Sequence, residues 1–387
     1  MRVLVLNVGS SSLKFDVYNT EIDLSELKGD IQHITTDALM KLSHDNTVSD
    51  VPLAITSHRE AIPIINELIE EYGLDYEAIG FRIVHGGDLA HHEIVTDEMI
   101  EKVKEFSPLA PLHNPIAMEV VELFREQTDK PIALIFDTVF YNTLPATSYT
   151  YSVPEQWREM GIRKYGFHGL SHDYLYRRVN ELTDAPRVIS CHLGAGSSIT
   201  ATTREGALDT SMGFSPLAGV MMGTRTGDID PAVVEFLANN TDLTLAQITR
   251  TLNSKSGFLA MTGTADVAEI CVRAIEGDAQ AQLAIDLFDK RIVDYIAQYY
   301  VEMGGVDALV FAGGIGENCP LIRHNIVEML APLGFTLDEQ ANEANVFDEP
   351  INGPSGPAIY VLQTNESVII AQGTEELVSE RESVIES

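Results

Sequence analysis

Three glycine-rich segments of this chain have the composition of phosphate-binding turns, namely Gly9 to Ser12, Gly194 to Ser198 and Gly313 to Gly316. Each follows a predicted strand. Glycine lets backbone N–H groups approach a phosphate closely, and serine hydroxyls add donors. None matches the Walker pattern or a dinucleotide-binding glycine motif, which argues against a P-loop enzyme and a nicotinamide-dependent dehydrogenase. One such segment is equally well explained as a tight turn, but three together favour a hairpin-type phosphate cradle.

Two arginines lie among apolar or glycine residues in a chain that is poor in arginine. They are Arg82 and Arg225. In the structural interpretation, each arginine forms an internal ion pair with a carboxylate. In the functional interpretation, each guanidinium is a fork that binds the oxygens of an anionic substrate. His168 and His172 flank Gly169 and match no zinc motif, so donation from a histidine to a phosphoryl oxygen is the more plausible role.

Two carboxylates lie just after predicted strands, at the edge of an α/β sheet where ligands bind. Asp137 follows residues 132–135, and Glu366 follows residues 359–362. Either carboxylate is also explained as a helix cap. Together with Asn7 they offer oxygen ligands to Mg²⁺, which favours few protein ligands plus water and phosphates.

Alternating strand and helix signals must position these residues, and they predict an α/β fold. Residues 3–6 form a strand, Gly9 to Ser12 a turn and residues 13–17 an alternating strand. The same order returns over residues 188–202, which suggests a duplicated fold with a cleft between its halves. A long helix is predicted over residues 279–303.

Two helix starts carry capping signals, and a last helix closes the sequence. Ser57 and Glu60 have the spacing of a capping box, and Asn114 is predicted as an N-cap. The last helix is predicted over residues 366–377.

The composition excludes several classes of protein. The chain has 387 residues, with 25 Lys and Arg against 58 Asp and Glu, and a formal net charge of −33. A chain with this excess of acidic residues lacks the basic surface that binding to nucleic acids or anionic membranes requires. The three cysteines form no Cys-x-x-Cys motif, and no apolar run approaches the roughly 18 residues of a membrane span. We therefore expect a two-domain cytoplasmic protein, whose acidity also raises the alternative of a salt-rich habitat.

In order and spacing, the motifs resemble one family, the acetate kinases, essentially from end to end. The matching segments are residues 7–15, 82–87, 111–115, 136–138, 165–169, 209–214, 222–231 and 313–318. The resemblance implies a duplicated α/β fold of the actin, hexokinase and sugar-kinase type with an interdomain cleft. Its domains would be residues 1–140 plus 367–387, and residues 141–366. It also implies a homodimer that transfers a phosphoryl group reversibly from ATP to acetate with Mg²⁺, or Mn²⁺ in its place.

The resemblance further implies roles for individual residues. The catalytic residues would be Arg82, Asp137, His168 and Arg225. The acetate would be bound by Arg82 and by an apolar pocket of Val84, Leu112, Phe167 and Pro216. Nucleotide would be bound by Ser10, Ser12, Lys14, His192, Leu193, Gly194, Ala195, Gly196, Asp266, Gly314, Ile315, Gly316, Glu317 and Asn318. The metal would be held by Asn7 and Glu366. Because acetate is already ionised at neutral pH, we expect Asp137 to orient a group or the metal rather than to act as a base.

Departures from the family pattern gather on the nucleotide side and keep alternatives open. Ala195 replaces an asparagine, and Ala268 stands where the family has an arginine beside the adenine. The donor is therefore ATP, another nucleotide or pyrophosphate. A propionate or butyrate kinase is an alternative on the acceptor side, since one methylene of the substrate contributes only about 1–3 kcal/mol to the discrimination between acids. A nucleotide-binding switch without turnover is more distant, because it would not need Arg82, His168 and Arg225 together.

Overall fold

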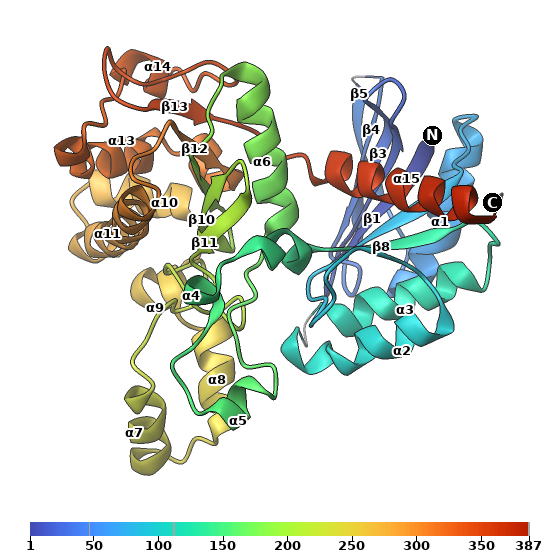
Figure 1. Ribbon diagram of the computed structural model, residues 1–387, viewed down its shortest axis with the longest axis horizontal. Coiled ribbons are helices and arrows are strands. Elements are labelled where there is room, and N and C mark those ends of the chain that lie inside the picture. The colour runs from blue at the N-terminus through green and yellow to red at the C-terminus, as the bar shows by residue number, and fades with distance from the viewer. Residues whose placement is uncertain (46, 111–112, 386–387) are drawn as a thin grey trace. The chain divides into compact units, whose positions relative to one another are not determined.

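The computed structural model describes residues 1–45, 47–110 and 113–385. The chain divides into two compact units, which we call the first unit (Met1–Phe140 with Asn365–Ser387) and the second unit (Tyr141–Thr364). Each unit has one sheet with helices packed against it, so the predicted α/β class is confirmed (Figure 1). No helix within the described ranges combines the length and hydropathy needed to cross a bilayer.

The first unit contains an eight-stranded sheet. Its strands are β1 (Arg2–Val8), β2 (Leu13–Asn19), β3 (Leu24–Gln32), β4 (Leu39–His44), β5 (Thr47–Pro52), β6 (Ala78–Ile83), β7 (Glu93–Ile94) and β8 (Ile132–Phe136). Its helices are α1 (His58–Glu71), α2 (Asp97–Glu105), η1 (Ser107–Leu109), α3 (Asn114–Arg125) and α15 (Glu366–Ile385), and η2 (Asp137–Thr143) follows β8. The strand order is β5-β4-β3-β2-β1-β6-β8-β7. β1 and β2 form the predicted antiparallel hairpin, and β1, β6 and β8 are parallel.

Successive residues of β6 face helices on opposite sides of the first sheet. A Cβ added to Gly80 would collide with the Thr374 side chain of α15, so this strand position needs glycine. The next residue, Phe81, meets Phe124 of α3 edge-on, with 5.8 Å between the ring centroids. Because neighbouring side chains of a strand point to opposite faces, α15 and α3 enclose the sheet (Figure 1).

The second unit contains a five-stranded sheet. Its strands are β9 (Val188–Leu193), β10 (Ser197–Thr203), β11 (Gly206–Thr210), β12 (Ala308–Ala312) and β13 (Ala358–Val361), in the order β11-β10-β9-β12-β13. Its helices are α4 (Ala146–Tyr149), α5 (Glu155–Arg158), α6 (Gly169–Leu182), α7 (Ala232–Asn240), α8 (Leu245–Ser254), α9 (Gly257–Thr262), α10 (Val267–Ile275), α11 (Ala279–Glu302), α12 (Gly313–Asn318), α13 (Pro320–Met329), η3 (Ala331–Leu333) and α14 (Glu339–Glu343). β9 and β10 pair antiparallel, and β12 lies parallel to β9. The predicted recurrence of strand, glycine turn and strand is therefore confirmed.

The capping interactions predicted for two helices are wrong, although Ser57 does occupy the N-cap position of α1. Ser57 precedes α1, but its side chain makes no capping hydrogen bond, and Glu60 instead accepts from the Thr56 backbone N–H at 2.6 Å. Asn114 is the first residue of α3 rather than its N-cap. Its amide is held by the backbone of His85, as described below.

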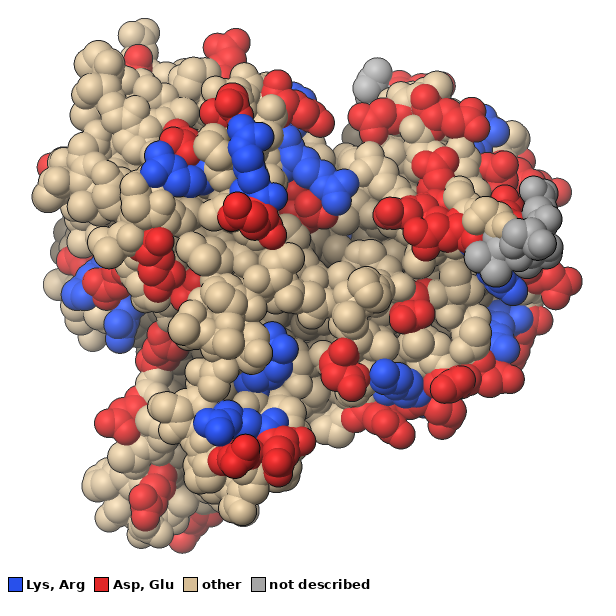
Figure 2. Space-filling view, viewed as in Figure 1, with Lys and Arg blue, Asp and Glu red and all other residues tan. Residues whose placement is uncertain are grey.

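Acidic side chains outnumber basic ones on the face of the molecule in Figure 2, on both units. This matches the excess of 58 Asp and Glu over 25 Lys and Arg in the sequence. A surface of this sign repels anions, so an anionic ligand requires cations that are concentrated at its site.

Candidate active site

Four predicted site residues form one hydrogen-bonded cluster in the first unit. Arg82 donates from Nε to Asp137 Oδ1 at 2.9 Å and from Nη2 to Oδ2 at 2.7 Å, a bidentate pair. Its Nη1 lies 3.1 Å from Glu366 Oε2, to which Asn7 also donates at 3.5 Å. The parallel strands β1, β6 and β8 bring Asn7, Arg82 and Asp137 together, because their carboxyl ends meet at one edge of the sheet, and Glu366 joins them from the first turn of α15.

Arg82 therefore forms the internal ion pair with a carboxylate that was one of the two interpretations of its sequence. The side chain of Asp137 is only 1% exposed and that of Arg82 15%. Burial disfavours the charged guanidinium, but the charges of Asp137 and Glu366 outweigh burial and hold the pKa of Arg82 above its ordinary value. With both carboxylates ionised, the cluster contains one positive and two negative charges.

The loop after β6 is fixed by buried polar contacts. The Asn114 side chain donates to the His85 carbonyl at 2.8 Å and accepts from the His85 N–H at 3.2 Å. Burial lowers the pKa of His85 to about 4, so its ring is neutral at pH 7. Because Asn114 is anchored in this way, it holds the loop that follows Arg82 and contains Val84.

The turn between β1 and β2 is braced by a histidine that the sequence did not single out. The Gly9 N–H donates to the Ser12 carbonyl at 2.9 Å. His58 Nε2 lies 2.9 Å from the Gly9 carbonyl and 3.2 Å from that of Ser12, so one N–H can serve both. Ser10 is exposed, and Lys14 is 61% exposed beside a single carboxylate of β3.

Arg225, in the second unit, differs sharply from Arg82. Its Nη1 donates to the Pro216 carbonyl at 3.1 Å and lies 3.7 Å from Met222 Sδ. No carboxylate among the described residues forms an ion pair with it, and burial lowers the pKa of Arg225 from its ordinary value. A guanidinium carries five N–H donors in a planar fork. The second unit thus contains a partly desolvated cation with donors suited to an anion.

A chain of hydrogen bonds runs behind His168. His168 Nδ1 lies 2.8 Å from Ser198 Oγ, His172 Nε2 lies 2.7 Å from the same oxygen, and His172 Nδ1 lies 2.6 Å from Ser190 Oγ. Burial, with a smaller effect from His192, lowers the pKa of His172 well below its ordinary value, so the ring is neutral. When Ser198 donates to His168 Nδ1, it accepts from His172, and Nε2 of His168 carries the proton.

Gly196, in the turn between β9 and β10, lies against both His168 and Arg225. A Cβ added here would be 3.3 Å from His168 Nε2 and 3.4 Å from Arg225 Nη1. His168 itself has φ +58° at the N-cap of α6, in a left-handed region that residues other than glycine rarely adopt and that is common at functional sites. The His168 imidazole and the Arg225 guanidinium therefore meet at this glycine turn. Such a set of donors is suited to binding a negatively charged oxygen.

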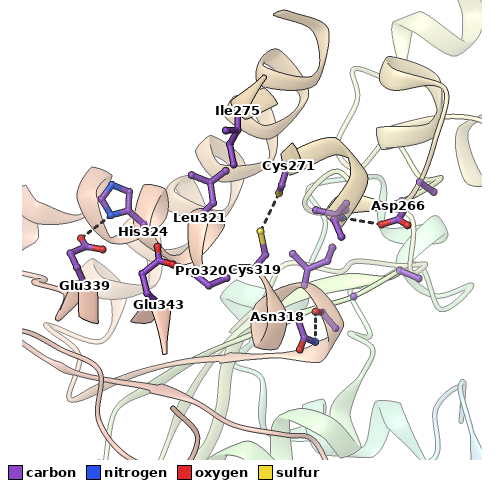
Figure 3. Close-up of a pocket in the computed structure, with 18 residues that line it drawn as sticks. Asp266, Cys271, Ile275, Asn318, Cys319, Pro320, Leu321, His324, Glu339 and Glu343 are labelled. Carbon is purple, nitrogen blue, oxygen red and sulfur yellow. Dashed lines mark hydrogen bonds and ion pairs between the residues drawn. The ribbon is translucent and has the colours of Figure 1, made fainter. Parts of the chain in front are cut away.

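A cavity of about 810 Å³ adjoins this turn in the second unit (Figure 3). Six predicted nucleotide residues line it: Gly194, Ala195, Asp266, Gly314, Ile315 and Asn318. Lining residues that were not predicted as site residues are Gly223, Ala265, Val267, Ala268, Cys271, Ile275, Cys319, Pro320, Leu321, His324, Glu339 and Glu343. Gly223 belongs to the matching segment 222–231, and Ala268 is one of the departures noted on the nucleotide side. The others come from α10, α13 and α14 and from the loops before them, where no local motif indicates binding.

Apolar and acidic side chains dominate the cavity wall. Among the described residues that line it, none is lysine or arginine, and His324 is paired with Glu339 at 2.8 Å. The Asp266 carboxylate caps α10 by accepting from the Ala268 N–H at 3.0 Å. This wall suits an uncharged ring and hydroxyl groups better than a second cluster of phosphates.

The third glycine-rich segment is not the open turn that was predicted. Gly313 to Gly316 forms the first turn of α12, where Glu317 Oε1 accepts the Gly313 N–H at 2.9 Å. Buried Arg323 donates to the carbonyls of Gly316 and Glu317 at 2.8 and 3.0 Å. Gly316 and Glu317 therefore serve the structure of α12, and neither lines the cavity.

The other predicted binding residues lie outside this cavity. His192, Leu193 and Gly196 belong to β9 and its turn, whereas Ser10, Ser12 and Lys14 belong to the first unit. The His192 ring lies 4.5 Å from that of His168.

The four residues predicted for the acyl pocket are distributed over both units. Val84 is half-buried in the first unit, and Leu112 lies outside the described residues. Phe167 is buried, with its carbonyl accepting from Tyr141 Oη at 2.6 Å, and Pro216 contacts Arg225 through its carbonyl.

Known proteins resemble this chain over almost its entire length. A profile described as the acetokinase family matches residues 2–372. The acetate kinase of Oceanobacillus iheyensis is 39% identical, over 96% of this chain and 97% of that protein. A solved propionate kinase from Francisella tularensis has 36% identity and a TM-score of 0.92, and Porphyromonas gingivalis acetate kinase has 34% and 0.88, each covering 97% of this chain and 99% of that chain. The predicted fold class is confirmed by these similarities.

Proposed function

Because this chain belongs to the acetokinase family, we propose that it transfers a phosphoryl group reversibly from ATP to acetate, giving acetyl phosphate and ADP. The observation that carries the proposal is Arg225, a guanidinium without a carboxylate partner among the described residues, beside His168 and a glycine turn. A partly desolvated guanidinium binds phosphate oxygens strongly.

The reaction needs charge neutralisation more than proton transfer. Acetate is ionised at neutral pH, so its attack on a phosphoryl group requires no base. Phosphoryl transfer depends on positioning and on stabilising the charge of the transition state. We assign donation to the phosphoryl oxygens to Arg225 and His168 Nε2, and the acetate carboxylate to Arg82. Asp137 acts through Arg82, whose guanidinium plane it fixes with two hydrogen bonds.

The cluster in the first unit has the donor chemistry that Mg²⁺ favours. Asn7 and Glu366 would hold the ion through hard oxygen ligands, and Mn²⁺ accepts the same ligands. No group of three or more His, Cys, Asp and Glu side chains arranged for a metal occurs in the part of the chain described. Water and phosphate oxygens would therefore complete the coordination. Bound in this way, Mg²⁺ neutralises negative charge on the phosphates.

The cavity of the second unit supports a nucleotide as the donor in preference to pyrophosphate. Pyrophosphate has no uncharged base or ribose, and its negatively charged terminal oxygens would find no lysine or arginine among the described residues of the cavity wall. A nucleoside places an uncharged base and ribose hydroxyls there, and carboxylates such as Glu343 can accept from hydroxyls.

One assay tests this proposal. Acyl phosphate formation, trapped as the hydroxamate, is measured with acetate, propionate and butyrate, each against ATP, GTP and pyrophosphate. We expect acetate with ATP and Mg²⁺ to give the highest kcat/KM. Faster turnover with propionate would instead support the activity named for the Francisella relative, and no product with any pair would contradict the kinase assignment.

The variant Gly196→Ala tests whether His168 and Arg225 act at one position. The added methyl group would lie 3.3–3.4 Å from both side chains and force them apart by a few tenths of an ångström. We expect kcat to fall by roughly 10²-fold, the cost of small misplacements in an active site. The midpoint of thermal unfolding should change little, since Gly196 does not have a positive φ. An unchanged kcat would show that His168 and Arg225 do not act together at this position.

We also propose that the protein forms a homodimer through the second unit. Phe236 of α7 and Leu245 of α8 are 64% and 62% exposed on two helices that pack together, and apolar side chains exposed on neighbouring elements can mark an interface. Light scattering that gave the mass of a single chain would contradict this assignment.

A further inference from the structure

Two cysteine side chains meet in the wall of the cavity. Cys271 lies on α10 and Cys319 at the junction of α12 and α13, and their sulfur atoms are 3.1 Å apart (Figure 3). Both residues line the cavity, and neither belongs to a disulfide. The third cysteine, Cys191, is fully buried in β9. The chain therefore contains one pair of thiols in mutual contact that small molecules can reach through the cavity.

The two thiols have different surroundings. Cys319 precedes α13; its hydrogen bond with Cys271 and the N–H groups of Leu321 and Ile322 lower its pKa below that of an ordinary thiol. The hydrogen bond to Cys319 and burial raise the pKa of Cys271. The first thiolate to form is therefore that of Cys319, which is also the more exposed of the two.

We propose that Cys271 and Cys319 form a reversible disulfide with a small-molecule disulfide as oxidant, and that this bond controls binding in the adjoining cavity. The control of binding rests on the proposed function, because it assumes that the cavity holds the nucleoside part of ATP. The formation of the disulfide itself does not depend on that function.

The chemistry balances as two thiol–disulfide exchanges. The Cys319 thiolate attacks one sulfur of glutathione disulfide, and one glutathione thiolate leaves. Cys271 then loses its proton to solvent and attacks the Cys319 sulfur, which expels the second glutathione thiolate. Two protein thiols are oxidised by two electrons, and one glutathione disulfide is reduced to two glutathiones.

The bond would change the cavity because it joins two of its walls. A disulfide requires sulfur atoms about 2.05 Å apart, so the 3.1 Å pair must approach by roughly 1 Å. That movement pulls α10, which begins beside Asp266, toward α12, which contributes Gly314 and Asn318. We expect the narrowed cavity to bind ATP about tenfold more weakly, and bound ATP to slow the oxidation in return, since such coupling is reciprocal.

The test uses the full-length protein, reduced or equilibrated with glutathione disulfide, then alkylated and analysed by mass spectrometry. We expect two fewer alkylated thiols after oxidation, one Cys271–Cys319 cross-linked peptide and full reversal by dithiothreitol. The variant Cys191→Ala should behave identically, whereas Cys271→Ala and Cys319→Ala should form no internal disulfide. A stable glutathione adduct without the cross-link would overturn the proposal.

Binding of a fluorescent ATP analogue to both redox forms separates this proposal from the proposed function. Tenfold weaker binding to the oxidised form, absent in Cys271→Ala, supports the control of binding. Equal affinity of the two forms overturns that control although the disulfide forms. A third outcome is that the reduced protein binds no nucleotide even though oxidation forms the disulfide. That result would contradict the assignment of the cavity to a nucleotide, and with it the control of nucleotide binding.

Discussion

Replacing Arg225 with alanine is expected to lower kcat for acetyl phosphate formation by about 10³-fold without unfolding the protein. Removal of one preorganised donor to a transition-state charge commonly costs 10²–10³-fold, and arginines in phosphoryl transfer contribute about 10³–10⁵-fold. The stability prediction follows from the same contacts. Within the described part of the chain, Arg225 donates to the Pro216 carbonyl and the Met222 sulfur and pairs with no carboxylate, so alanine leaves no carboxylate there without its cation.

The matched control is Arg291→Ala. Arg291 belongs to the same unit, is 49% exposed and pairs with Asp294 at 3.5 Å, so its loss should leave kcat within twofold. Steady-state kinetics and thermal unfolding of both variants separate catalysis from folding. If Arg225→Ala retained a tenth of the activity, the assignment of Arg225 to the phosphoryl group would be wrong. If it unfolded, Arg225 would have a structural role that its contacts do not indicate.

Much of the fold could be predicted from local sequence. The strands around Gly9 and around residues 194–198 have clear apolar patterns, and the helix predicted over residues 279–303 is α11. Prediction from local sequence failed where a polar side chain forms its hydrogen bonds with a segment that is distant in the sequence. Asn114 has the sequence context of an N-cap, but its amide is held by the backbone of His85 across the unit.

The candidate site was predictable in its residue types but not in its pairings. Arg82 and Arg225 look equivalent in sequence, since each belongs to a segment that contains glycine and apolar residues. Only the fold shows that Glu366, near the other end of the chain, neutralises one of them and that no described carboxylate pairs with the other. The contact between Cys271 and Cys319 was hidden for the same reason, because helix packing rather than spacing creates it.

Replacing Arg82 with alanine is expected to affect both activity and stability, in contrast to Arg225. Asp137 is buried and Glu366 is 18% exposed, and both would lose their cation. Removing one partner of a buried ion pair typically costs about 3–5 kcal/mol. We therefore expect the free energy of unfolding to fall by about 3 kcal/mol in urea titrations, and kcat to fall by at least about 10²-fold because the acetate loses its cation.

The double variant Arg82→Ala/Asp137→Asn separates the two effects. Asparagine removes the carboxylate that Arg82→Ala leaves buried without its guanidinium, so part of the lost stability should return, with a coupling energy of about 1–3 kcal/mol in the double-mutant cycle. Activity should not return, since the acetate site still lacks its cation. The single variant Asp137→Asn keeps Arg82 charged, and the asparagine oxygen can accept only one of the two guanidinium N–H groups, so the fork is oriented less firmly. We expect an intermediate loss of kcat; near-normal turnover of Asp137→Asn at saturating Mg²⁺ would show that Asp137 neither orients Arg82 nor assists the metal.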